Sequence, residues 1–235
     1  MQPLTDRQLL EVFGRGRERH PLDRALLLLA AALPDGEAER LADLPIAERD
    51  DALLALRAAT FGPRLASYID CDGCGERLEF ELDATALLGA APRPSTAGVV
   101  QLGERCFRLP TSRDLARIAD ADDEHEASRR LAALCCTDGA GDSALSDELI
   151  AELETAFAHA DPGANIQLSF DCPACHRSWQ EVFDIGEYFW EELERSSKLL
   201  LGQVHRLASA YGWSEHEILS LGATRRAMYL ELVDA

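Results

Sequence analysis

Two pairs of cysteines in this sequence have the residue type and the spacing of metal ligands. Cys71 and Cys74 lie in the stretch CDGCG, and Cys172 and Cys175 lie in CPACH. A Cys-x-x-Cys turn supplies two ligands to a metal ion, and a structural zinc ion takes four ligands in a tetrahedron. We therefore predict one shared structural Zn²⁺ site made by Cys71, Cys74, Cys172 and Cys175.

Segments with the alternating pattern of β-strands flank both cysteine pairs. RLASYID and RLEFELD surround the first pair, and NIQLSFD and SWQEVFD surround the second. Two such hairpins facing each other would form a zinc ribbon, here a discontinuous one because 97 residues separate Cys74 from Cys172. The free-energy cost of closing a loop grows only logarithmically with the length of the loop. This insertion therefore costs much less than the roughly 10–16 kcal/mol that a structural zinc site supplies.

Other interpretations of the cysteines remain open. Each pair could be a redox dithiol, although neither lies between a strand and a helix as in a thioredoxin-like unit. Each could also be inert core cysteine, and His176 could replace one cysteine as a ligand. His176 more simply occupies the position that Gly75 has in the first pair. Cys106, Cys135 and Cys136 have the character of small buried apolar residues, with no histidine placed to activate them.

Composition and charge limit the classes of partner. The chain has 235 residues, 47% hydrophobic and 28% charged, which is ordinary for a globular protein with a core. A net charge of −19 argues against a nucleic-acid partner, because phosphate binding requires clustered Lys and Arg. The N-terminus lacks a secretory pattern and the longest apolar run, ALLLLAAAL, is too short to span a membrane. We therefore expect a cytoplasmic protein with no membrane partner, in which paired cysteines indicate metal binding or catalysis before disulfides.

The elements around the ribbon predict an α+β fold. Capping and periodicity indicate three N-terminal helices, a hairpin turning at Gly103-Glu104, three helices in the insertion, and a long helix that ends at Gly212 and is followed by two short ones. Pro and Gly mark residues 89–98 as a linker. The expected parts are a helical N-terminal unit (1–64), a first ribbon half (65–88), a mixed α/β insertion (99–163), a second ribbon half (164–185), and a C-terminal part with the long helix and a helical tail (186–235).

Six stretches in a fixed order are spread over most of the chain: HPLDRALLLLAAALP, ERDDALLALRAATFG, CDGCGERLEFEL, FRLPTSRDLA, FDCPACHRSWQEVFDIGEYFWEEL and HRLASAYGWSEHEILSLGATRRAMYLELV. In these the chain resembles the baseplate hub assembly chaperones and related baseplate proteins of contractile phage tails and tail-like contractile injection systems. The resemblance implies a protein that helps to assemble the central hub of a baseplate by contacts with baseplate or hub proteins, without catalysis. The sequence departs from the usual ribbon at His176, where a glycine normally follows the last cysteine.

Side chains of the C-terminal part are candidate contacts with such a partner. The aromatic residues at the start of the long helix surround a full helical turn, so some belong to the core and the others are available for a partner. Paired arginines with a nearby tyrosine offer planar charge and an aromatic anchor. The alternative is that the aromatics are all core and the arginines only solvated. The candidate contacts are Tyr188, Trp190, Trp213, Arg225, Arg226 and Tyr229.

The sequence leaves alternatives to the assembly function. A permanent structural baseplate component has the same features as an assembly factor. A zinc-ribbon factor associated with nucleic-acid machinery is disfavoured by the charge, since Arg77 and Arg177 are the main cations beside the cysteine pairs. A thiol-redox enzyme would need an exposed cysteine with a low pKa. The sequence contains no Gly-rich phosphate loop, nucleophile elbow or His-Glu-x-x-His motif, so we expect no enzymatic activity.

Overall fold

A computed structural model of the chain describes residues 1–33, 38–90, 98–138 and 145–234, and it has the expected α+β architecture. The helices are α1 (Asp6–Gly16), α2 (Pro21–Ala31), α3 (Ala38–Leu41), α4 (Ile46–Phe61), α5 (Ala84–Ala90), α6 (Ser112–Ile118), α7 (Glu124–Cys135), α8 (Asp147–Ala160), α9 (Ile185–Tyr211), α10 (Glu215–Ser220) and α11 (Ala223–Val233). The strands are β1 (Arg64–Asp70), β2 (Arg77–Asp83), β3 (Val99–Leu102), β4 (Arg105–Arg108), β5 (Gln167–Asp171) and β6 (Ser178–Val182). They pair as three antiparallel hairpins: β1–β2, β3–β4 and β5–β6.

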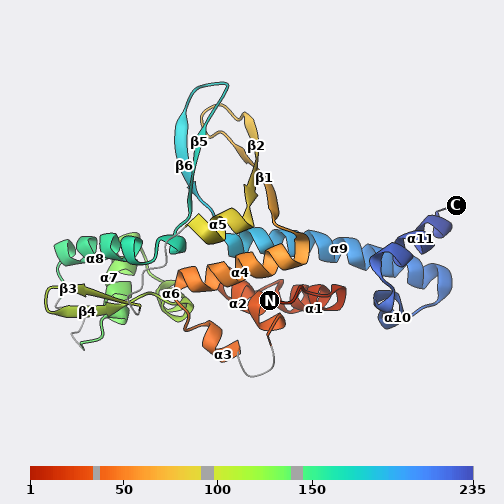
Figure 1. Cartoon of the computed structure of the whole chain (residues 1–235), viewed down its shortest axis with the longest axis horizontal. Helices are drawn as coiled ribbons and strands as arrows, with labels where there is room; N and C mark the ends of the chain where they lie inside the picture. Colours follow the sequence, from red (N-terminus) through yellow and green to blue (C-terminus); the bar gives the residue numbers. More distant parts are fainter. Residues whose placement is uncertain (34–37, 91–97, 139–144, 235) are drawn as a thin grey trace.

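The main core lies where α1, α2 and α4 pack against α9, which runs along the helical body and continues beyond it to α10 and α11 (Figure 1). The buried positions of α9 recur at helical spacing, and Phe189, Leu193 and Leu207 are completely buried. Phe189 meets Phe61 of α4 edge to face, with ring centroids 6.0 Å apart. The N-terminal helices and the long C-terminal helix therefore share one core.

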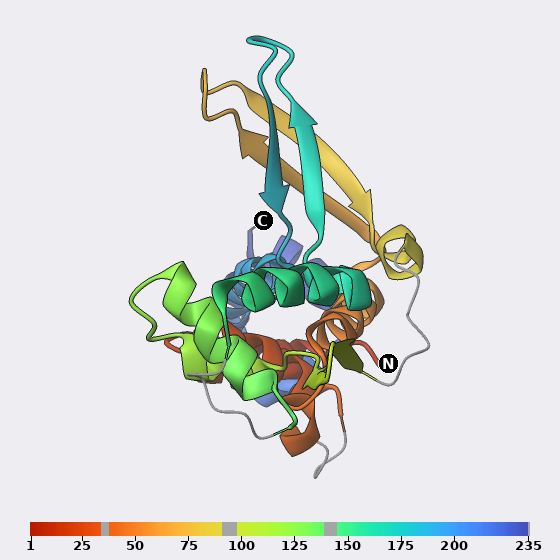
Figure 2. The ribbon, with the colours of Figure 1, turned by 90° about the vertical axis from the view of Figure 1, so that its left-hand side faces the viewer.

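A second, smaller core stabilises the insertion. Val100 and Phe107 of the β3–β4 hairpin pack against α7 and α8, where Ile150 and Leu153 are buried. The hairpin turns at the predicted place, with Gly103 in the left-handed region at φ 60°. Figure 2 shows α8 and α7 at the end of the molecule that carries this insertion.

Local signals place most helix ends correctly. The Thr5–Gln8 and Ser214–Glu217 capping boxes form at the starts of α1 and α10, and α9 ends at Gly212 with φ 70°. Two short helices, α3 and α5, are absent from the sequence-based prediction. The predicted linker 89–98 begins inside α5, and its residues 91–97 lie outside the described part of the chain.

The hairpins β1–β2 and β5–β6 project together from the helical body (Figures 1 and 2). Their facing sides meet at Phe80 and Phe170, whose ring centroids are 5.0 Å apart, and Trp179 stacks on Phe170 at 5.5 Å. All three aromatic side chains are only partly buried, so this inter-hairpin core is small. Within the described residues, no helix is both long enough and apolar enough to cross a membrane.

Candidate metal centre

The two cysteine pairs occupy the turns at the far ends of the projecting hairpins. Residues 71–76 connect β1 to β2, and residues 172–177 connect β5 to β6. In Figures 1 and 2 these turns are the parts of the hairpins most distant from the helical body. The hairpins thus carry sequence-distant cysteines to one place.

The four thiols form a single compact cluster. Their Sγ atoms all lie within 4.8 Å of one another. The Sγ atoms of Cys71 and Cys175 are 3.6 Å apart, and those of Cys74 and Cys172 are also 3.6 Å apart. Four sulfurs placed 2.3 Å from a central ion at tetrahedral angles would be separated by about 3.8 Å. The predicted convergence of the pairs is confirmed, and the donor set fits a tetrahedral metal ion.

The two turns have the same backbone hydrogen bonds. The N–H of Gly75 donates to the Cys71 carbonyl at 2.8 Å, and the N–H of His176 donates to the Cys172 carbonyl at 2.9 Å. Gly75 has φ 76° and His176 has φ 59°, both in the left-handed region. His176 therefore occupies the position of Gly75, as expected, and it is not among the clustered ligands.

A glycine exchange at these two positions tests the turn geometry. Gly75→Ala should lower the free energy of unfolding by about 1 kcal/mol, because alanine in the left-handed region is strained. His176→Gly should be neutral or slightly stabilising, because relief of strain offsets the greater freedom of glycine in the unfolded chain. Metal release to a chelator and thermal unfolding would measure both effects. A larger loss from His176→Gly than from Gly75→Ala would indicate that the imidazole contributes more than its backbone conformation.

Backbone donors in the turns favour the thiolate form of one cysteine. The N–H groups of Cys175 and Ala174 point at the Cys172 sulfur and lower the pKa of this thiol to about 7. The N–H of Glu76 acts in the same way on Cys74, but the neighbouring sulfurs, together with partial desolvation, outweigh it and raise the pKa of this thiol to about 12. Four thiolates at this separation repel one another, so a bound cation is what would allow all of them to ionise.

Other contacts join the two turns across the cluster. Arg177 of the second turn donates to Asp72 of the first at 2.7 Å. Gly73 lies close to the second turn, since a Cβ there would be 3.1 Å from Arg177 Cδ and 3.6 Å from Cys175 Sγ. Because both ionic groups are more than half exposed, the ion pair contributes little, and the close approach of the turns depends on the sulfurs.

Cys71 and Cys172 are buried, whereas Cys74 and Cys175 are exposed. The cluster is thus closed on its protein side and reachable by solvent on the other.

Comparison of the chain with protein-family models, curated proteins and solved structures gives no match.

The remaining cysteines lie away from the cluster. Cys135 of α7 is completely buried, and burial raises the pKa of its thiol to about 12. Cys106 lies in β4, and Cys136 follows α7 and forms an isolated β-bridge with Phe107. A thiol with a raised pKa is a poor nucleophile at neutral pH, which agrees with a packing role for Cys135.

Two of the six candidate partner contacts are buried within the chain, which corrects the expectation that they face a partner. Trp190 is 4% exposed and packs against Phe13 and Gly16, where a Cβ would approach its ring to 2.5 Å. Arg226 is 3% exposed and bonds to Asp6 and to the carbonyl of Leu221. Arg226 links α11 to the start of α1, so its guanidinium binds groups of the same chain and does not face a partner.

Three of the other candidates lie at the C-terminal tip of the molecule. Trp213 and Tyr229 meet edge to face with ring centroids 4.9 Å apart, and Tyr211 stacks on Trp213 at 4.7 Å. Arg225 is exposed and lies over the Tyr229 ring at 5.8 Å. These residues form an aromatic cluster that is partly accessible, although much of it holds α9, α10 and α11 together.

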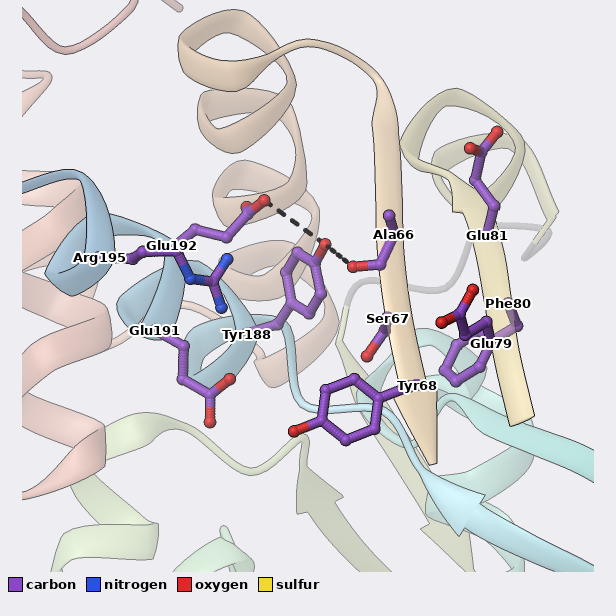
Figure 3. Close-up of a pocket in the computed structure, with 10 residues that line it drawn as sticks. All are labelled: Ala66, Ser67, Tyr68, Glu79, Phe80, Glu81, Tyr188, Glu191, Glu192 and Arg195. Atoms are coloured by element: carbon purple, nitrogen blue, oxygen red, sulfur yellow. Dashed lines mark hydrogen bonds between the residues drawn. The ribbon is translucent and has the colours of Figure 1, made fainter. Parts of the chain in front are cut away.

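The sixth candidate, Tyr188, lies in a cleft that the sequence did not indicate (Figure 3). Its hydroxyl donates to the Ala66 carbonyl of β1 at 2.9 Å, which links α9 to the first hairpin. The cleft has a volume of about 620 Å³ and lies between β1–β2 and α9. Alternation in β2 places Glu79 and Glu81 on its outer face, but no sequence signal indicates that α9 lies beside this hairpin.

Proposed function

We propose that this protein is a non-enzymatic assembly chaperone or adaptor for the baseplate hub of a contractile phage tail or tail-like injection system. It acts in the cytoplasm through protein–protein contacts. The observation that carries the non-enzymatic part is that the cluster contains four thiols. Protein sulfurs would take all four positions around an ion, so no position is left for a substrate or a reactive water.

The metal in this proposal is zinc, in a structural role. Four cysteine sulfurs in a tetrahedral arrangement suit zinc or iron. Zinc has no redox chemistry of its own, which fits a purely structural role. Cys74 and Cys172 are 98 positions apart in the sequence, so one ion would fasten the two ends of a long insertion. Its role is to hold a rigid shape.

The baseplate part of the proposal depends on the sequence resemblance, and the surface is compatible with it. Among the described residues, six of the nine large exposed apolar side chains lie in the C-terminal third: Val182, Leu199, Leu201, Tyr211, Met228 and Leu232. Five of them lie on α9 and α11, which pack against each other, and exposed apolar side chains there are available to another protein. The charge of −19 favours partners with basic surfaces.

Co-expression of the tagged protein with the separate hub, spike, tube and sheath proteins of one injection system tests this function. We expect co-purification with a hub or baseplate component and with no tube or sheath subunit. Deletion of the gene should give particles without complete baseplates. Complete, contractile particles from the deletion strain would contradict the proposal. Mass spectrometry of purified mature particles then tells an assembly factor, which is absent from them, from a permanent component.

A further inference from the structure

Strand β1 has a free edge that carries unpaired backbone groups. The N–H of Cys71 donates to Glu76 and the N–H of Ala84 donates to Pro63, each at 2.9 Å. These bonds fix the antiparallel pattern, in which residues 65, 67 and 69 bond to β2 and residues 66, 68 and 70 direct their N–H and C=O groups away from it. Among the described residues, no third strand pairs with β1 on this side.

Near the helical body this edge is already occupied. The carbonyl of Arg64 accepts from Arg57 at 2.6 Å, and that of Ala66 accepts from Tyr188 at 2.9 Å. The Ala66 N–H lies between these two carbonyls and has no hydrogen-bond partner in the described part of the chain, and beyond them both backbone groups of Tyr68 also have none. Tyr68 is 57% exposed, so this segment of the edge is accessible.

A cleft of about 620 Å³ lies next to this edge. One wall is the β1–β2 hairpin, lined by residues 66–68 of the edge strand β1 and residues 79–81 of β2. Tyr188, Glu191, Glu192 and Arg195 line the other wall from one face of α9 (Figure 3). An edge strand beside an open cleft is the arrangement to which a partner adds a strand.

The charges in the cleft favour a cationic occupant. Glu192 is paired with Arg57, and Glu81 is paired with Arg64 at 3.3 Å. The remaining carboxylates of the lining, those of Glu79 and Glu191, have no ion-pair partner among the residues that the structure describes. Arg195 adds one positive charge to the lining, and Arg77, which lies over the Tyr68 ring at 4.0 Å, is itself paired with Asp70. Among the described residues, the lining therefore has two carboxylates without an ion-pair partner against one guanidinium, in a protein that is itself strongly acidic.

We propose that an extended, positively charged segment of a partner protein binds in this cleft and adds to β1 as a third strand. Its backbone pairs with the free groups of Ala66 and Tyr68, and its Lys or Arg side chains reach Glu79 and Glu191. This inference rests on the proposed adaptor function and names the contact through which the adaptor holds its partner.

A labelled decapeptide in which lysine alternates with threonine is the probe, titrated against the full-length, metal-loaded protein by fluorescence anisotropy. Ala66→Pro removes an outward N–H without breaking a β1–β2 bond, so it should weaken binding about tenfold. The matched control is Ser169→Pro, whose N–H also points away from its partner strand in β5–β6 and should leave affinity unchanged. The Glu79→Gln/Glu191→Gln double variant should weaken binding roughly fivefold.

Equal affinity of the wild type, Ala66→Pro and the double glutamine variant would overturn the inference, as would no binding by the wild type. The double variant keeps the test valid if Ala66→Pro unfolds the hairpin, which circular dichroism and metal content would reveal. If Ala66→Pro still co-purifies with hub proteins as well as the wild type does, the cleft inference is wrong and the adaptor function stands. If the wild type binds the peptide but no baseplate protein, the adaptor function is wrong.

Discussion

Replacing Cys172 by serine is expected to remove the metal ion and to unfold the two projecting hairpins. Cys172 is 1% exposed, and its sulfur lies 3.6 Å from that of Cys74. A neutral serine hydroxyl is a poor substitute for a soft thiolate ligand. Because a structural zinc site supplies roughly 10–16 kcal/mol of apparent binding free energy, its loss outweighs any other single contact in the hairpins. Elemental analysis should find one zinc ion per wild-type chain and almost none in the variant.

The rest of the hairpin structure is too small to compensate for the metal. Phe80, Phe170 and Trp179 are only partly buried, and isolated two-stranded hairpins are marginally stable in water. The helical body has its own core of completely buried leucines, such as Leu28 and Leu53. Hydrogen exchange should therefore show lost protection in β1–β2 and β5–β6 of the variant, while amides of α4 and α9 remain protected.

Cys106→Ser is the matched control, because Cys106 lies in β4 and outside the cluster. It should keep the metal content and the hairpin protection of the wild type. Wild-type metal content in Cys172→Ser, or an equal loss in both variants, would show that the four clustered sulfurs are not the ligands.

The convergence of the cysteine pairs could be predicted because the signals involved are local. The spacing of Cys71 and Cys74 defines a turn, the alternation around it defines two strands, and the same pattern recurs at Cys172 and Cys175. A tetrahedral ion then supplies the long-range restraint, since it requires both turns at one point. Few other pairs of segments in the chain contain residues whose chemistry requires them to lie close together.

Partners of buried charges could not be predicted in this way. On helical spacing alone Arg226 could be a solvated or a partner-binding residue, yet it bonds to Asp6, 220 positions earlier. Trp190 is buried because Gly16 leaves room for its ring, and the sequence does not say that α1 lies against this turn of α9. Short helices such as α3 are missed for another reason, because four residues provide too few periodic positions to be recognised.

Local sequence signals determine one wall of the cleft beside β1, and long-range packing determines the other. Tyr68 pairs with Glu79 across the hairpin, so both lie on the same face of it, and the alternation of side chains along each strand is a local pattern. The opposite wall comes from Glu191 and its neighbours on α9, more than a hundred positions away, and depends on the packing of α4 against α9. The sequence therefore indicates the residues of the hairpin wall of this cleft, and it does not indicate that α9 forms the opposite wall.

Glu192→Gln is expected to destabilise the helical body by about 3 kcal/mol, because it leaves a buried guanidinium without a counter-charge. Arg57 of α4 is 2% exposed and makes two hydrogen bonds to the Glu192 carboxylate of α9, at 2.6 Å and 2.7 Å. The same guanidinium bonds to the carbonyls of Gly62 and Arg64, so it joins α4, the start of β1 and α9. Guanidinium-chloride unfolding followed by circular dichroism would measure the loss.

The matched control is Asp70→Asn, which breaks an exposed pair of the same chemistry. Arg77 also makes two hydrogen bonds to the Asp70 carboxylate, at 2.8 Å and 3.1 Å, but both side chains are at least half exposed. Water screens this pair and replaces its hydrogen bonds, so Asp70→Asn should leave unfolding of the body unchanged. If the two variants lose the same stability, burial does not set the strength of the Arg57–Glu192 contact. The packing of α4 on α9, and with it the wall of the cleft, would then depend on the apolar core alone.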